Sequence, residues 1–200
     1  MKTLLMNDTE PAFCAPLAQK GYQIIPSKKI DVFLPPEQRH ADLQALSIGD
    51  RLFTPETCIK PVGQAYPDNV RLNCLFVNHR LYGHLGAVDP SVLEYCRQHE
   101  ICCVHVNQGY ARCSTLVLND TAAVTADKSI EKALRNDGVD VLLIRPGHIR
   151  LEGFSYGFIG GATFTDDRTV FCFGDITKHP DYLRIRQFCE AYHFKIEIIG

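Results

Sequence analysis

One of the nine cysteines stands where a thiol could do chemistry. Cys113 lies in the stretch "GYARCSTLVLND", between Arg112 and Ser114 and directly before an apolar run. A thiolate is a strong nucleophile, and a neighbouring cation favours the thiolate over the neutral thiol. Cys113 is therefore a candidate nucleophile, which we expect to alkylate faster than the other eight cysteines. The alternative is a small buried residue, which is the commoner role of cysteine.

Further polar side chains occur in other segments that we interpret as loops. "RHADLQ" offers His40 and Asp42, "QAYPDNVRLN" offers Asp68 and Asn69, and the glycine-rich "GFSYGFIGGA" offers Tyr156. Functional groups concentrate on loops that a rigid scaffold presents, so these side chains are candidate site residues. The alternatives are solvated turns for the first two loops and core packing for Tyr156.

One cluster could be drawn as a metal site. "ICCVHV" places Cys102, Cys103 and His105 close together in the sequence. Neighbouring side chains of a strand point to opposite faces, however, and no second group of ligands follows. The sequence therefore predicts no metal and no cofactor.

The bulk composition is ordinary for a globular protein. Apolar residues make up 46% of the chain and charged residues 22%, with a formal net charge of −2. This charge gives no reason to expect nucleic acid as a partner, and no segment has the length of a membrane span or the pattern of a signal peptide. An odd number of cysteines without a secretory signal indicates free thiols in a reducing compartment. We therefore expect a single cytoplasmic domain over residues 1–200, and leave a homo-oligomer open.

The sequence predicts four β-hairpins along the chain. Short apolar stretches flank two-residue polar turns whose residues tolerate the left-handed backbone of tight hairpins. Three of the hairpins precede a predicted helix and then a strand, whereas the unit at residues 30–60 lacks a convincing helix. The expected turns are Gly49-Asp50, Asn78-His79, Asn119-Asp120 and Asp166-Asp167.

The two chain ends read as parts of one further unit. "KTLLMN" is followed by a predicted helix and a strand, while "KIEIIG" reads as a first strand without its hairpin partner. A repeat divided between the termini is typical of ring-shaped repeat folds. We expect "KTLLMN" beside "KIEIIG", with a fifth repeat that is degenerate or lacks a C-terminal closing segment.

This pattern resembles the pentein, or guanidine-modifying enzyme, superfamily. "GYARCST" is similar to the stretch that ends in the catalytic cysteine of these enzymes, and His40-x-Asp42 is similar to their His-x-Asp pair. "IRLEGFSYGFIGGA" resembles an uncharacterised bacterial branch of the superfamily. The resemblance implies an α/β fold, a ring of about five αβ repeats (an α/β propeller) with pseudo-fivefold symmetry. The Glu-Gly-Gly-Asp stretch typical of the deiminases is absent.

The resemblance also implies a cysteine-dependent hydrolase, or an amidinotransferase, acting on a small guanidino or amidino compound. Cys113 would attack the guanidinium carbon and form a covalent thiouronium intermediate. His40 would protonate the leaving amine and then activate water, while Asp42 would orient His40 or bind a substrate nitrogen. The expected substrate-binding residues are Asp68, Asn69, Arg112 and Tyr156.

A different class of function remains open at this point. The same ring could serve as a non-catalytic binding module, because a fold alone does not determine an activity. The enzyme requires Cys113, His40 and an acidic residue in one pocket. The binding module requires a broad exposed patch instead.

Overall fold

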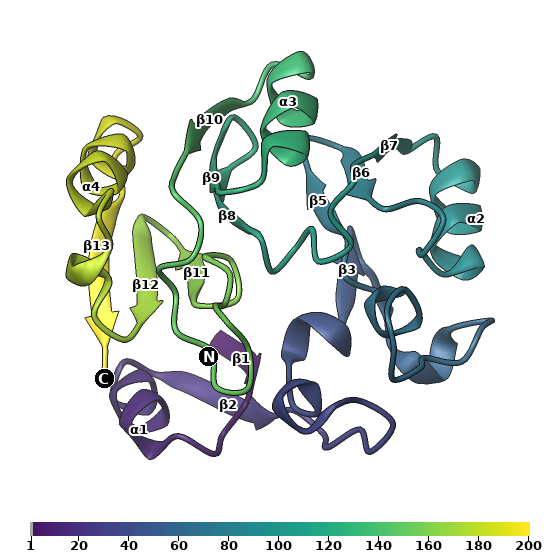
Figure 1. Ribbon diagram of the computed structural model, residues 1–200, viewed down its shortest axis with the longest axis horizontal. Helices are drawn as coiled ribbons and strands as arrows, with labels where there is room; N and C mark the ends of the chain where they lie inside the picture. Colours follow the sequence, from purple (N-terminus) through teal and green to yellow (C-terminus); the bar gives the residue numbers. More distant parts are fainter. Residues whose placement is uncertain (1) are drawn as a thin grey trace.

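The computed structural model describes residues 2–200. In these residues the chain forms short strands, helices and five small, separate sheets (Figure 1). The helices are α1 (Pro11–Gln19), α2 (Pro90–Gln98), α3 (Lys128–Asn136) and α4 (Tyr182–Ala191). The strands are β1 (Lys2–Met6), β2 (Tyr22–Pro26), β3 (Leu46–Ile48), β4 (Arg51–Phe53), β5 (Leu75–Val77), β6 (Arg80–Gly83), β7 (Cys102–His105), β8 (Thr115–Asn119), β9 (Ala122–Thr125), β10 (Asp140–Leu143), β11 (Thr163–Asp166), β12 (Thr169–Phe173) and β13 (Lys195–Ile199).

Three of the sheets repeat one topology. In β5-β6-β7, β8-β9-β10 and β11-β12-β13, the first two strands form a hairpin and the third lies parallel to the second. A helix connects the second strand to the third in each unit, as the sequence predicts. β3 and β4 form a hairpin followed only by 3-10 turns, which confirms that the unit at residues 30–60 lacks an α-helix. The result is a mixed α/β fold of repeated units.

The units follow one another around the middle of the molecule. Figure 1 shows the chain passing from β1 and β2 through the units of α2, α3 and α4, with both termini on the same side. β1 pairs with β2 in parallel and not with β13. The two terminal units nevertheless share an apolar cluster that contains Met6, Phe171 and Ile199. The sheets are not joined into one closed sheet, so the pseudo-fivefold symmetry stays a prediction.

Local sequence signals account for the ends of the helices. The carboxylate of Asp89 accepts the amide N–H of Ser91 at the start of α2, and Asp127 caps α3 in the same way. α1 and α2 each begin at a proline, which fits the first helical position. Gly138 ends the α3 segment with a φ of +82°, a conformation that glycine adopts without strain.

Two of the four predicted hairpin turns are confirmed. Gly49-Asp50 joins β3 to β4, and Asn78-His79 joins β5 to β6. Gly49, Asn78 and His79 all have positive φ, as tight hairpins of this kind require.

The other two turns were predicted one residue too early. The turn residues are Asp120-Thr121 and Asp167-Arg168, because Asn119 pairs with Ala122 and Asp166 pairs with Thr169. A register shift between Val117 and Asn119 moves the first turn, and the Asn119 side chain accepts the amide N–H of Thr121 there.

The core lies between the units in several apolar clusters. The largest contains Leu116, Val124, Val170 and Ile185, which come from two consecutive units. All nine cysteines have free thiols. Among residues 2–200, every α-helix is far shorter than a bilayer crossing requires, and none qualifies as a membrane span.

Asp89 should be a major contributor to stability. The side chain is fully buried and accepts backbone N–H groups from Ile59, Lys60 and Ser91. Burial acts to raise the pKa of Asp89, but hydrogen bonds from the Ser91 hydroxyl and from these backbone N–H groups outweigh burial and hold the pKa below its ordinary value. We expect Asp89→Ala to lower the free energy of unfolding by about 2–3 kcal/mol at pH 7.

The check is chemical denaturation at several pH values, with Asp175→Ala as the control at an exposed cap. A group whose pKa is lowered in the folded state stabilises the fold at pH values above its unfolded-state pKa. The difference in unfolding free energy between wild type and Asp89→Ala should therefore shrink as the pH falls through the folded-state pKa. An equal loss of unfolding free energy in both variants would show that the buried Asp89 cap stabilises the fold no more than the exposed Asp175 cap does.

Candidate functional site

A cavity of about 610 Å³ lies between the units, and we call it the main cavity. Its volume is within the range of ordinary small-molecule sites. Part of its polar lining comes from the loop before β3 and the turn before β8, which supply Glu37, His40, Asp42 and Cys113, and Asn7, Glu10 and Arg150 line it from other segments. Its apolar lining comes mainly from β1, α1, β11, β12 and residues 149–158.

The repeated topology explains why these polar residues meet. Asp42, Asn73, Cys113 and Gly161 each lie a few residues before the first hairpin strand of a different unit. Corresponding positions in successive units therefore point to the same central region. Gly160 permits the close approach, because an added Cβ would lie 2.4 Å from the carbonyl oxygens of Arg112 and Thr115.

The Cys113 thiol is held between a carboxylate and a carboxamide. Its Sγ donates to Oδ2 of Asp42 at 3.2 Å and accepts Nδ2–H of Asn73 at 3.0 Å. Asn73 also donates to the Asp42 carbonyl oxygen, and its Oδ1 accepts the amide N–H groups of Arg112 and Cys113. One carboxamide thus fixes both the thiol and the backbone on either side of it.

The surroundings of Cys113 favour the neutral thiol in the free protein. Burial is the main cause that raises its pKa well above the ordinary value, and the negative charge of Asp42 adds to this effect. The hydrogen bond from Asn73 and the charge of Arg112 act in the opposite direction but are weaker. The expected fast alkylation of Cys113 therefore requires a change in its surroundings, such as a bound cation.

His40 is half-buried at the same cavity. Burial lowers the pKa of His40 below its ordinary value, and the charges of Asp42 and Glu37 only partly oppose this shift. The imidazole is therefore neutral at pH 7 and can accept a proton.

Glu37 is a second carboxylate at the main cavity that the sequence interpretation missed. It is only 3% exposed and accepts hydrogen bonds from the Tyr110 hydroxyl at 2.8 Å and from Nδ2 of Asn69 at 3.2 Å. Among residues 2–200, no Lys, Arg or His forms an ion pair with Glu37 or Asp42. A buried carboxylate without a cationic partner is costly, which makes this cavity a fitting place for a cation.

The structure brings five of the seven predicted site residues to the main cavity. These residues are Cys113, His40, Asp42, Arg112 and Tyr156. The Arg112 guanidinium donates to the Thr115 carbonyl oxygen. Tyr156 is 40% exposed at the rim.

The other two predicted residues lie outside the cavity lining. Asn69 is buried behind it and hydrogen-bonds Glu37 and Tyr110. Asp68 is exposed and forms an ion pair with Arg71, so it is not brought to the cavity.

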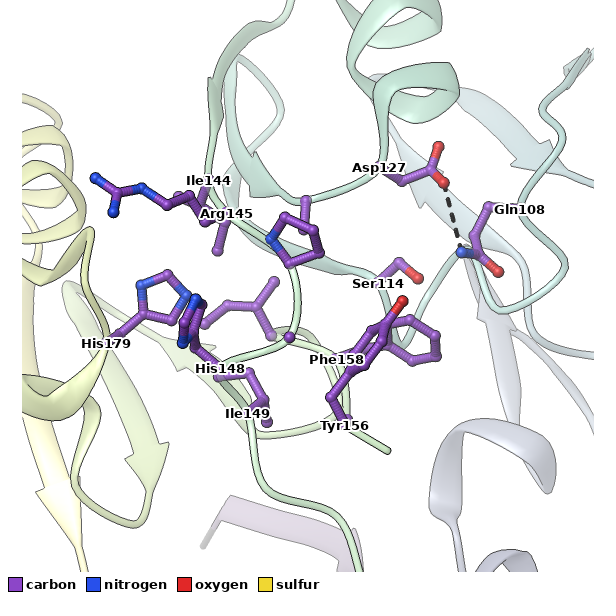
Figure 2. Close-up of a pocket in the computed structure, with 15 residues that line it drawn as sticks. Gln108, Ser114, Asp127, Ile144, Arg145, His148, Ile149, Tyr156, Phe158 and His179 are labelled. Atoms are coloured by element: carbon purple, nitrogen blue, oxygen red, sulfur yellow. Dashed lines mark hydrogen bonds between the residues drawn. The ribbon is translucent and has the colours of Figure 1, made fainter. Parts of the chain in front are cut away.

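A second, smaller pocket of about 70 Å³ lies on the other side of residues 149–158. Figure 2 shows Gln108 and Asp127 at one side of this pocket and His148 and His179 at the other. Ser114 also lines it, and neither its Oγ nor Nε2 of His179 has a hydrogen-bond partner. A polar pocket of this size suits ordered water.

The structure gives no support for a metal centre in the part of the chain it describes. No group of three or more His, Cys, Asp or Glu side chains is close enough to hold a metal ion within residues 2–200. Cys102 is exposed and Cys103 is half-buried, as expected for alternating side chains of a strand. The absence of a cofactor stays a prediction.

Comparison with known proteins identifies the fold. The dimethylarginine dimethylaminohydrolase of Pseudomonas aeruginosa, in a complex with citrulline, has a TM-score of 0.56 at 10% identity, covering 100% of this chain and 92% of the other. A dimethylarginine dimethylaminohydrolase adduct with S-methyl-L-thiocitrulline has the same TM-score at 12% identity, covering 95% and 79%. No curated protein matches the sequence. The chain therefore shares the fold of these dimethylarginine dimethylaminohydrolases. It belongs to a family of unknown function, DUF6873, whose model matches residues 53–200.

The environment of Cys113 leads to a prediction about its reactivity. Asp42→Asn removes the negative charge beside Sγ and should lower the pKa of the thiol. At pH 8 we expect iodoacetamide to alkylate Cys113 faster in this variant, by roughly tenfold for each unit by which the pKa falls.

Mass spectrometry of the Cys113 peptide against time measures the rate. Asp68→Asn is the matched control, because Asp68 is paired with Arg71 away from the cavity. An unchanged or slower rate in Asp42→Asn would contradict the described electrostatics.

Proposed function

We propose that the protein is a cysteine-dependent enzyme that acts on a small guanidino or amidino compound, most simply as a hydrolase. The observation that carries the proposal is the contact between the Cys113 thiol and Asp42 in a cavity that His40 and Glu37 also line. The fold likeness adds support, since one structure of this fold is described as a complex with citrulline. The nine free thiols fit a cytoplasmic protein.

Two carboxylates would recognise the substrate cation. A guanidinium is planar and presents N–H donors along several edges, which carboxylates accept in pairs. Asp42 and Glu37 line the cavity without cationic partners, so Glu37 takes the role that the sequence interpretation gave to Asp68. Asn69 would position Glu37 and not touch the substrate.

Binding of the cation would also activate the thiol. A guanidinium held by Asp42 neutralises the charge that disfavours the thiolate and adds a positive charge near Sγ. The proton of Sγ would then move to the neutral imidazole of His40. The thiolate would thus form only when a substrate is present, which limits side reactions of the free protein.

The proposed hydrolysis has two halves. Sγ of Cys113 bonds to the guanidinium carbon, a C–N bond breaks, and His40 gives its proton to the leaving amine. A water molecule then gives a proton to His40 while its oxygen bonds to the carbon. The C–S bond breaks, the hydroxyl on the carbon loses its remaining proton to solvent, a urea-type product leaves, and the thiolate recovers the proton from His40. An amine in place of water would give amidino transfer.

The non-catalytic binding module is the less favoured function. It requires no cluster of a thiol, an imidazole and carboxylates at one cavity, and such a cluster is present. Most of the exposed large apolar side chains are spread over different units of the chain.

Substitution at the proposed site should separate chemistry from binding. We expect Cys113→Ser to abolish turnover of guanidino substrates, since a serine hydroxyl is a far weaker nucleophile here. Glu37→Gln should raise KM at least tenfold with a smaller effect on kcat, because it removes a charge-assisted contact to the substrate. Asp68→Asn should change neither value more than about twofold.

The measurement is the release of ammonia or amine from a panel of methylated, alkylated and acidic guanidines. Circular dichroism and thermal melting establish that each variant is folded. Turnover that survives in Cys113→Ser would overturn the mechanism, and wild-type protein that neither turns over nor binds any guanidine would favour the binding module.

A further inference from the structure

The lining of the main cavity divides into two contiguous regions. The polar region contains two hydrogen-bonded groups, Cys113 with Asp42 and Glu37 with Tyr110. The apolar region is a set of packed side chains, which are Leu4, Met6, Phe13, Phe164 and Phe173. A substrate bound at Cys113 therefore faces one region of each kind.

Aromatic packing makes the apolar region continuous. The rings of Phe13 and Phe173 have centroids 5.3 Å apart, and those of Phe164 and Phe173 are 5.8 Å apart. Phe154 lines the cavity from residues 149–158 and is 39% exposed. This amount of apolar surface inside a ligand cavity favours burial of apolar ligand atoms.

The volume of the cavity exceeds what a guanidinium group needs. A guanidinium has four non-hydrogen atoms, whereas the main cavity measures about 610 Å³ and lies within the range of drug-sized ligand sites. The remaining space is lined largely by the apolar region. A fitting substrate thus carries a substantial group on one guanidinium nitrogen, and the lining selects its polarity.

Cationic side chains at the cavity are the competing feature. Arg39 donates to the Ser27 carbonyl oxygen and Arg112 donates to the Thr115 carbonyl oxygen, which partly occupies each guanidinium. Arg150 is exposed and also lines the cavity. An ion pair between Arg150 and a substrate carboxylate would be screened by solvent and therefore worth little.

We propose that the substrate is a guanidine with an apolar alkyl or aryl substituent, and not a guanidino acid. This inference rests on the proposed function, because it takes the guanidinium to bind at Asp42 and Glu37. The apolar substituent packs against Phe154 and the phenylalanines of α1, β11 and β12. One region of the cavity thereby binds the charged guanidinium, and the other selects for the length of the apolar substituent.

Calorimetric titration of wild-type protein with methyl-, butyl- and hexylguanidine tests the proposal. We expect the affinity to rise about fourfold for each added methylene, as for burial of apolar chain. Butylguanidine should bind more tightly than 4-guanidinobutyrate. Phe154→Ser should weaken hexylguanidine while leaving methylguanidine unchanged, and its exposed position makes misfolding of the variant a small risk.

The outcomes separate this inference from the proposed function. If methylguanidine binds but the length of the alkyl chain does not change the affinity, the preference for an apolar substituent is wrong, whereas the guanidine site is supported. Tighter binding of 4-guanidinobutyrate than of butylguanidine also overturns the inference. It would show that a cationic side chain such as Arg150 binds a carboxylate on the substrate. If no guanidine binds, or hexylammonium binds as tightly as hexylguanidine, the guanidine function itself fails.

Discussion

The Asn73 side chain holds the centre of the molecule together. Its carboxamide donates to Sγ of Cys113 and to the Asp42 carbonyl oxygen, and it accepts the amides of Arg112 and Cys113. Three successive units therefore meet at one buried side chain. Since a buried carboxamide with unmet hydrogen bonds is costly, this network constrains the relative placement of the units as well as the thiol.

The same centre carries negative charge that no ion pair among residues 2–200 balances. A thiol and two carboxylates line a cavity in which neither carboxylate has a cationic partner among the described residues. Burial, together with the negative charge of Asp42, raises the pKa of Cys113 and favours the neutral thiol. A planar cation would satisfy both carboxylates at once, which links recognition to activation of the nucleophile.

Much of the fold could be predicted from the sequence, because its signals are local. Asp89 and Asp127 mark the helix starts by capping, and Gly49 marks a turn through its positive φ. The turn after β8 was misplaced by one residue, because the register shift near Asn119 arises from strand pairing and not from turn composition.

The candidate site was predicted only in part, for a physical reason. Cys113, His40 and Asp42 stand out as reactive residue types, whereas Asn73 and Glu37 matter only through contacts with residues distant in the sequence. Alignment of the units could have found Asn73, which precedes its hairpin as Cys113 does. Asp68 is predicted as a substrate-binding carboxylate, but in the structure it forms an ion pair with Arg71 and does not line the main cavity.

The central claim is that a bound guanidinium converts Cys113 from thiol to thiolate. The most direct measurement is the pH titration of the Cys113 Cβ resonance in protein labelled with ¹³C at cysteine, with and without methylguanidine. The account predicts a pKa above that of an ordinary cysteine in the free protein and a clear decrease when methylguanidine binds. A pKa that methylguanidine leaves unchanged, although it binds at the main cavity, would contradict the account.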